Sequence, residues 1–166
     1  MQELLALALL SLQAGTTAGD RTVPPDPAAT PIVTAQGKGV QIYRCQDKPD
    51  GAAWVFVAPE ATLYQGAEKV GTHDAGPTWR WKDGSTVSGK LLVSQPAPDG
   101  KSIPWLLLTA TPGPTPGTLA QVSYVRRSDT QGGAAPQQGC DAQHLGSLVR
   151  TDYSATYTFY GSGRHR

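Results

Sequence analysis

Hydrophobic and polar residues alternate with a period of two along several short stretches of the chain, a pattern typical of half-buried β-strands. The stretch at residues 153–160 shows it most clearly. Its aromatic and alanine residues share one face, opposite serine and threonine: Tyr153, Ala155, Tyr157 and Phe159. Runs rich in β-branched and aromatic residues predict further strands over 39–45, 54–57, 103–110 and 119–127. No helical apolar stripe extends beyond about ten residues, so the pattern predicts an all-β protein.

An Asp-Gly pair at residues 83–84 joins two predicted strands, 78–82 and 85–93, and gives the clearest hairpin signal. In the first of these strands Trp79 and Trp81 face the same way, and the two basic residues of the strand face the other way. Proline and glycine clusters separate the strands and predict long Gly/Pro-rich loops. Together the strands predict a single antiparallel β-sandwich or barrel of about six to nine strands.

The ends of the chain differ from its middle. Residues 1–18 hold an apolar run followed by small residues, which predicts a signal peptide, with an ordinary apolar N-terminal helix as the alternative. Residues 19–31 are proline-rich and predict an exposed leader that favours polyproline II. We expect the β domain to span residues 32–160 and residues 161–166 to form a disordered tail.

Composition and charge narrow the class of partners. The 166-residue chain has 14 Lys+Arg against 13 Asp+Glu and a formal net charge of +1. No strong field of either sign therefore attracts a polyanion, and we expect no nucleic-acid partner. No apolar run reaches the roughly 20 residues that a membrane helix needs, so no membrane span is predicted. With the signal peptide, these features predict a secreted or periplasmic protein.

The chain has two cysteines, Cys45 and Cys140. In an exported protein such a pair is first interpreted as a disulfide. The alternative is a metal site of two cysteines and two histidines, in which His73 and His144 complete the ligand set. Because thiolates are poorly kept in an oxidising compartment and no C-x-x-C spacing occurs, we predict the disulfide, and neither a metal nor another cofactor.

His73 lies in residues 71–77, where two glycines and a proline predict a loop before the tryptophan-rich strand. Functional polar groups are often placed on such loops. His73 next to Asp74 is suited to act as a general base or a metal ligand. The alternative is a structural histidine, because adjacent residues of an extended chain point apart.

Trp79 and Trp81 have two possible roles on their shared face. Two tryptophans on one strand face are usually part of a β core, because large rings dominate such interiors. If they face water instead, they form a flat surface suited to a sugar ring or an apolar ligand.

Several short motifs follow one another in order from about residue 31 to residue 160. They are GVQIYRC at 39–45, WVF at 54–56, PEA at 59–61, VGTH at 70–73, GPTW at 76–79, DGS at 83–85, IPWLLL at 103–108, VSYVRR at 122–127 and GGAAP at 132–136. In these motifs the chain resembles a secreted family of bacteria and fungi, domain of unknown function 3455. The resemblance implies a single secreted β-rich domain with Cys45 and Cys140 at the cysteine positions of the family, and it implies no activity.

These observations lead to three hypotheses about function. The first is a secreted binding domain that holds a saccharide or a small apolar ligand at a surface formed by His73, Asp74, Trp79 and Trp81. The second is a metal-dependent secreted enzyme that uses His73, and the third is a structural protein of the cell envelope. A shallow aromatic groove favours binding, whereas two histidines that converge with a carboxylate favour catalysis.

Overall fold

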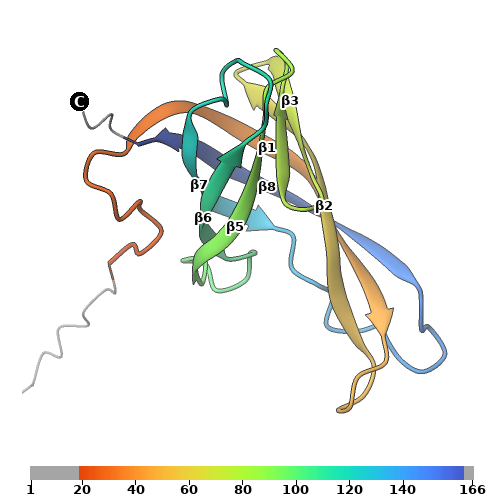
Figure 1. Ribbon diagram of the computed structural model, residues 1–166. Coiled ribbons are helices and arrows are strands. Elements are labelled where there is room, and N and C mark those ends of the chain that lie inside the picture. The colour runs from red at the N-terminus through yellow and green to blue at the C-terminus, as the bar shows by residue number, and fades with distance from the viewer. Residues whose placement is uncertain (1–18, 163–166) are drawn as a thin grey trace, which may run out of the picture.

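The computed structural model describes residues 19–162, which form eight antiparallel strands and no helix (Figure 1). The predicted signal peptide, residues 1–18, and residues 163–166 of the predicted tail lie outside the described residues. The strands are β1 (Thr30–Gln46), β2 (Ala53–Gln65), β3 (Glu68–Asp74), β4 (Thr78–Trp81), β5 (Thr86–Gln95), β6 (Trp105–Pro112), β7 (Val122–Gly132) and β8 (Leu148–Gly161). Among residues 19–162 no helix is available that could cross a membrane.

Each strand pairs with the next one along the chain, and β8 pairs with β1, so the sheet closes into a barrel. The closing contact is long: the β1–β8 register runs from Thr30 opposite Gly161 to Arg44 opposite Leu148. β1, β2 and β8 extend past the other strands toward the end that holds the β1–β2 turn and the β7–β8 loop (Figure 1). The all-β prediction is confirmed, and of its two architectures the structure is the barrel.

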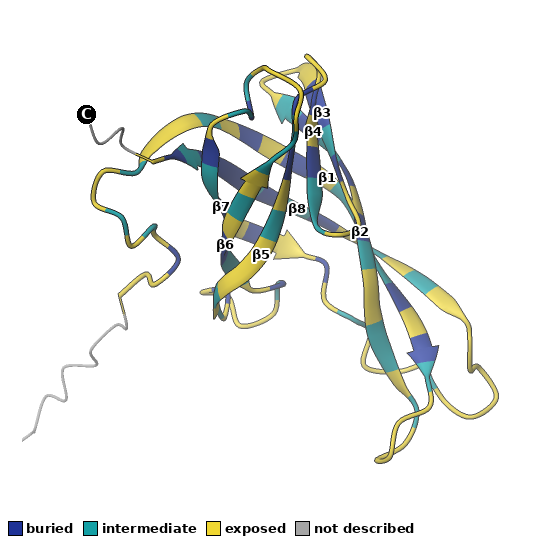
Figure 2. Cartoon of the chain, in the orientation of Figure 1, coloured by how far each residue is buried: buried dark blue, intermediate teal, exposed yellow. Residues whose placement is uncertain are grey.

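Inward and outward positions alternate along the strands, as bands of buried and exposed residues in Figure 2 show. On β8 the four residues predicted to share a face, Tyr153, Ala155, Tyr157 and Phe159, are all buried. On β4 Trp79 and Trp81 are buried, and Arg80 between them is exposed. The two tryptophans therefore belong to the core, which was one of the two roles predicted for them.

The loop predicted for residues 71–77 is wrong, because β3 occupies most of it and His73 is a strand residue. Its two glycines have different functions. Gly71 is within β3, where a Cβ would lie 2.2 Å from the carbonyl oxygen of Arg80 on the neighbouring strand β4. Gly76 is in the short turn between β3 and β4 and has a φ of 118°, which favours glycine. The close approach of two strands, and not a turn, accounts for Gly71.

The leader is not wholly exposed. The side chain of Arg126, on β7, forms an ion pair with Asp20 and donates a hydrogen bond to the hydroxyl of Thr22, which is fully buried. Arg126 lies opposite Leu107 in the β6–β7 register, and Leu107 is also fully buried. The leader therefore packs against the outer face of β6 and β7. At the other end, Gly161 belongs to β8 and not to the predicted tail.

Cys45 and Cys140 form a disulfide, as predicted. The bond joins the end of β1 to the long loop between β7 and β8, and 95 positions separate the two cysteines in the sequence. The backbone of Cys45 adds two hydrogen bonds to the same loop, from its N–H to the carbonyl of Ser147 and from the N–H of Gly146 to its carbonyl. The loop is thereby attached to the extended end of the barrel.

We expect the double variant Cys45→Ala/Cys140→Ala to fold but to lose about 4 kcal/mol of unfolding free energy, because the bond closes a loop of nearly a hundred residues in the unfolded chain. Urea denaturation of the variant and the wild type measures the difference. Wild type unfolded in the presence of a reductant is the matched control and should lose a similar amount. Equal stability of the oxidised wild type and the double variant would contradict the expectation.

Candidate functional site

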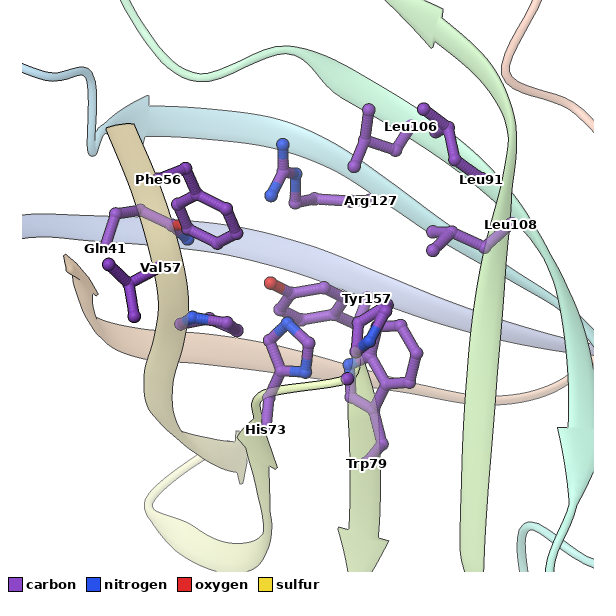
Figure 3. Close-up of a pocket in the computed structure, with 13 residues that line it drawn as sticks. Gln41, Phe56, Val57, His73, Trp79, Leu91, Leu106, Leu108, Arg127 and Tyr157 are labelled. Carbon is purple, nitrogen blue, oxygen red and sulfur yellow. The ribbon is translucent and has the colours of Figure 1, made fainter. Parts of the chain in front are cut away.

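A cavity of about 250 Å³ opens into the barrel interior (Figure 3). Every strand contributes to its lining, together with the β3–β4 turn. The lining residues are Gln41, Phe56, Val57, Pro59, His73, Gly76, Pro77, Trp79, Leu91, Leu106, Leu108, Arg127 and Tyr157. Most of these side chains are apolar or aromatic, as is common in sites for small molecules.

The floor of the cavity is a cluster of three buried rings. His73 and Trp79 lie opposite each other in the β3–β4 register, and their rings stack with centroids 4.4 Å apart and an interplanar angle of 5°. The Tyr157 ring packs against both, at centroid distances of 5.1 Å from His73 and 5.8 Å from Trp79. Glycine on β1 makes room for it, since a Cβ at Gly37 would lie 2.5 Å from Cε2 of Tyr157.

The rim of the cavity is apolar and partly exposed. Phe56 and Val57 on β2 are 51% and 45% exposed, and Leu91 on β5 is 57% exposed. Figure 3 places Phe56 and Val57 on one side of the cavity and Leu91, with Leu106, on the other. The cavity therefore has a buried aromatic floor and an entrance bordered by large apolar side chains.

His73 is neutral at the floor of the cavity. Its Nδ1 lies 3.0 Å from the carbonyl oxygen of Thr78, and because a carbonyl only accepts, Nδ1 carries the proton and Nε2 is an acceptor. Burial lowers the pKa of His73 to about 4, the positive charge of Arg127 acts in the same direction, and the hydrogen bond to Thr78 opposes both. In Figure 3 the ring points into the cavity toward Tyr157.

Three further polar side chains reach the cavity from β1, β7 and β8. Arg127 lies opposite Tyr157 in the β7–β8 register, and its Nε and Nη2 donate to the carbonyl of Pro104 at 3.0 and 2.8 Å. The hydroxyls of Tyr157 and Tyr153 are 2.9 Å apart. Burial raises the pKa of Tyr157, so its hydroxyl keeps its proton at neutral pH. The third side chain is that of Gln41 on β1, which is 2% exposed.

The structure brings together two of the four predicted site residues. His73 and Trp79 line the cavity, whereas Trp81 does not line it and packs against Phe159, at a centroid distance of 6.1 Å. Asp74 is exposed and accepts a hydrogen bond from the hydroxyl of Thr72, so it does not orient the His73 ring. The two residues point apart, as adjacent residues of a strand do.

The two-cysteine, two-histidine alternative does not fit the structure. Cys45 and Cys140 are bonded to each other, and His144 pairs with Asp141 on an exposed loop, at 2.7 Å between Nδ1 and Oδ1. Among residues 19–162 no three His, Cys, Asp or Glu side chains gather as metal ligands. His73 therefore has neither a second histidine nor a carboxylate beside it in the cavity lining that the structure describes.

Sequence reasoning missed most of the lining. The most informative residue that it missed is Arg127. The predicted strand 119–127 did contain a signal for it, because Val125 is an apolar inward residue and Arg127 lies two residues further along, on the same face of the strand. Tyr157 was placed on the inner face, yet nothing in its pattern separates a cavity wall from a filled core. Gln41, Leu106 and Leu108 come from predicted strands, but only the packing of the barrel brings them together.

Comparison with known proteins gives one family. The family described as "Protein of unknown function (DUF3455)" matches residues 25–69 and 65–161, which together include every lining residue of the cavity. No curated protein and no solved structure matches the chain.

The low pKa of His73 predicts a pH-dependent stability. The unfolded chain takes up a proton on this ring below about pH 6.5, whereas the folded protein resists protonation until about pH 4. The unfolding free energy should therefore fall by about 3 kcal/mol as the pH drops from about 6.5 to about 4. Below about pH 4 His73 should contribute no further change. Urea denaturation from pH 7 to pH 4 tests this. His73→Gln should lose that dependence, and His144→Gln, at the exposed histidine, should retain it.

Trp79 should be a major contributor to stability because it is 1% exposed and stacks on His73. We expect Trp79→Ala to lower the unfolding free energy by about 3–5 kcal/mol. The neighbouring exposed residue supplies the control, since Arg80→Ala should change it by less than about 0.5 kcal/mol. Similar effects of the two substitutions in thermal or chemical denaturation would contradict the burial of Trp79.

Proposed function

The chain belongs to the DUF3455 family of proteins of unknown function, and from this starting point we propose that its barrel binds a small, mostly apolar molecule in the cavity above His73, Trp79 and Tyr157. The observation on which the proposal rests is the combination of a preformed cavity with a buried aromatic floor and an entrance of partly exposed apolar side chains. Exposed apolar side chains around a concave site are a common mark of a binding surface. The volume of about 250 Å³ is just below the roughly 300–1,000 Å³ of sites for drug-sized ligands, which favours a small molecule.

The same geometry favours an apolar ligand over a saccharide. A sugar ring stacks on an aromatic face that is open to water, and the interior positions of Trp79 and Trp81 offer no such face. Transfer of an apolar molecule from water into a cavity of this kind lowers the free energy of the system, in proportion to the apolar area that is buried.

A binding role also accounts better for His73 than a catalytic role does. A general base works best with a pKa near the operating pH, and the pKa of His73 is about 4. The ring is stacked on Trp79 and bonded through Nδ1 to a backbone carbonyl, which suits a fixed wall with one hydrogen-bond acceptor. A purely structural role for the protein gives no account of the cavity.

We place this binding protein outside the cytoplasm, in a secreted or periplasmic location. The support is the disulfide between Cys45 and Cys140, since such bonds persist mainly in oxidising compartments. The predicted signal peptide agrees with this location.

The proposal is tested with a neutral apolar probe, N-phenylnaphthylamine, whose fluorescence rises when it leaves water. We expect saturable binding to the wild type. Leu106→Trp, which adds volume inside the cavity, should weaken binding by about tenfold, a loss of roughly 1.4 kcal/mol. The control is Leu92→Trp, at a residue of similar chemistry on β5 that is exposed but does not line the cavity.

Thermal denaturation of both variants verifies that they fold. Unchanged probe binding by a folded Leu106→Trp protein, or equal losses in both variants, would place the binding elsewhere and contradict the proposal. The proposal would also be contradicted if neither this probe nor octanoate, octanol or octylamine bound saturably to the wild type.

A further inference from the structure

The cavity contains a positive charge that no acidic residue balances. Arg127 lines it, and none of the lining residues that the structure describes is an aspartate or a glutamate. Two other arginines have an acidic partner: Arg126 pairs with Asp20, and Arg150 pairs with Glu60 on the outer surface. Within residues 19–162, Nε and Nη2 of Arg127 donate to the carbonyl of Pro104, and the guanidinium group also lies close to the Tyr157 hydroxyl, so the groups around it are neutral and N–H donors are left over.

Two more donors among the lining residues lack a well-aligned acceptor. Nε1 of Trp79 is buried and has no hydrogen-bond partner within the described part of the chain, and Nε2 of Gln41 is buried with no well-aligned partner, although the Gln41 side chain lies close to the hydroxyl of Tyr153. Gln41 and Trp79 are 2% and 1% exposed, so water at the surface does not satisfy them. Buried polar groups are nearly always paired in folded proteins. The Trp79 donor and the poorly aligned Gln41 donor therefore have capacity for an acceptor on a bound molecule.

The Arg127 guanidinium acts on both Tyr153 and Tyr157, and the Gln41 amide acts on Tyr153. Burial and the neighbouring Tyr157 raise the pKa of Tyr153, while Arg127 and the Gln41 side chain both act to lower it. The Tyr153 hydroxyl in turn contacts the hydroxyl of Tyr157, which lies opposite Arg127 in the register. Figure 3 shows Gln41, Arg127 and Tyr157 around the same part of the cavity.

Charge and hydrogen-bonding capacity together define a ligand class. We propose that the cavity binds an organic monocarboxylate, with its carboxylate group at Arg127 and Gln41 and its apolar body against Leu106, Leu108 and Phe56. A carboxylate has only acceptors and pairs well with a guanidinium group. One arginine balances one negative charge, so a monoanion fits the site better than a dianion. This inference rests on the proposed function, because it assigns the polar end of the same ligand.

The test compares three ligands of equal chain length, octanoate, octanol and octylamine, by isothermal titration calorimetry at neutral pH. We expect octanoate to bind about tenfold more tightly than octanol, because charge-assisted hydrogen bonds are stronger than neutral ones, and octylamine to bind most weakly. This comparison uses the wild type alone and does not depend on how any variant folds.

Variants then locate the charge. Arg127→Met should reduce octanoate affinity about tenfold and leave octanol affinity nearly unchanged, and Arg127→Lys should retain part of the preference for octanoate. Arg80→Met is the matched control, because Arg80 is exposed on the outer face of β4, and this variant should bind all three ligands as the wild type does.

The outcomes separate this inference from the proposed function. Equal binding of octanoate and octanol, tighter binding of octylamine, or an octanoate preference that survives in a folded Arg127→Met protein would overturn the monocarboxylate while the apolar cavity still binds. Failure of all three alkyl ligands and of N-phenylnaphthylamine to bind would overturn both.

Discussion

The antiparallel pairing of β1 with β8 is the contact on which the rest of the structure depends. β1 pairs with β2 along its other edge. Without the pairing of β1 with β8, the sheet would therefore stay open and expose β1 and β8 as two unpaired edges. Closure gives each strand one face toward a shared interior. A barrel of eight strands encloses a space that side chains fill completely or that leaves room for one small ligand. The choice and order of inward side chains therefore decide whether this barrel is solid or hollow.

On several strands, one inward residue belongs to the filled core and the next inward residue, two positions away, lines the cavity. The inner residues of the filled part are Trp81 on β4, Val125 on β7 and Phe159 on β8, and the next inward residues, which line the cavity, are Trp79, Arg127 and Tyr157. The aromatic cluster packs against Phe159 of the core and also forms the floor of the cavity, so the same rings stabilise the fold and define the cavity.

The parts of this structure that could be predicted are those that depend on local patterns. Alternation placed Tyr157 on an inner face and Trp79 on one face with Trp81, and the Asp-Gly pair at residues 83–84 marked the β4–β5 turn correctly. The prediction failed for β3, because Gly71 resembles a turn residue in sequence and becomes a close-contact residue only when β4 lies against it. The cavity depends on contacts between distant strands, and a period of two cannot distinguish an inward residue that meets others from one that meets empty space.

The charge of Arg127 and the cavity depend on each other. An arginine at an inward position of a filled barrel would be buried without a counter-charge, which is strongly destabilising. Here the guanidinium group lies in an open part of the interior, close to the Pro104 carbonyl and to an entrance bordered by Phe56 and Leu91. Its charge also lowers the pKa of His73, in addition to the larger effect of burial, so that the ring stays neutral. At neutral pH the described lining of the cavity therefore contains one positive charge, one neutral histidine acceptor and no carboxylate, and the proposed preference for a negatively charged apolar ligand rests on this balance.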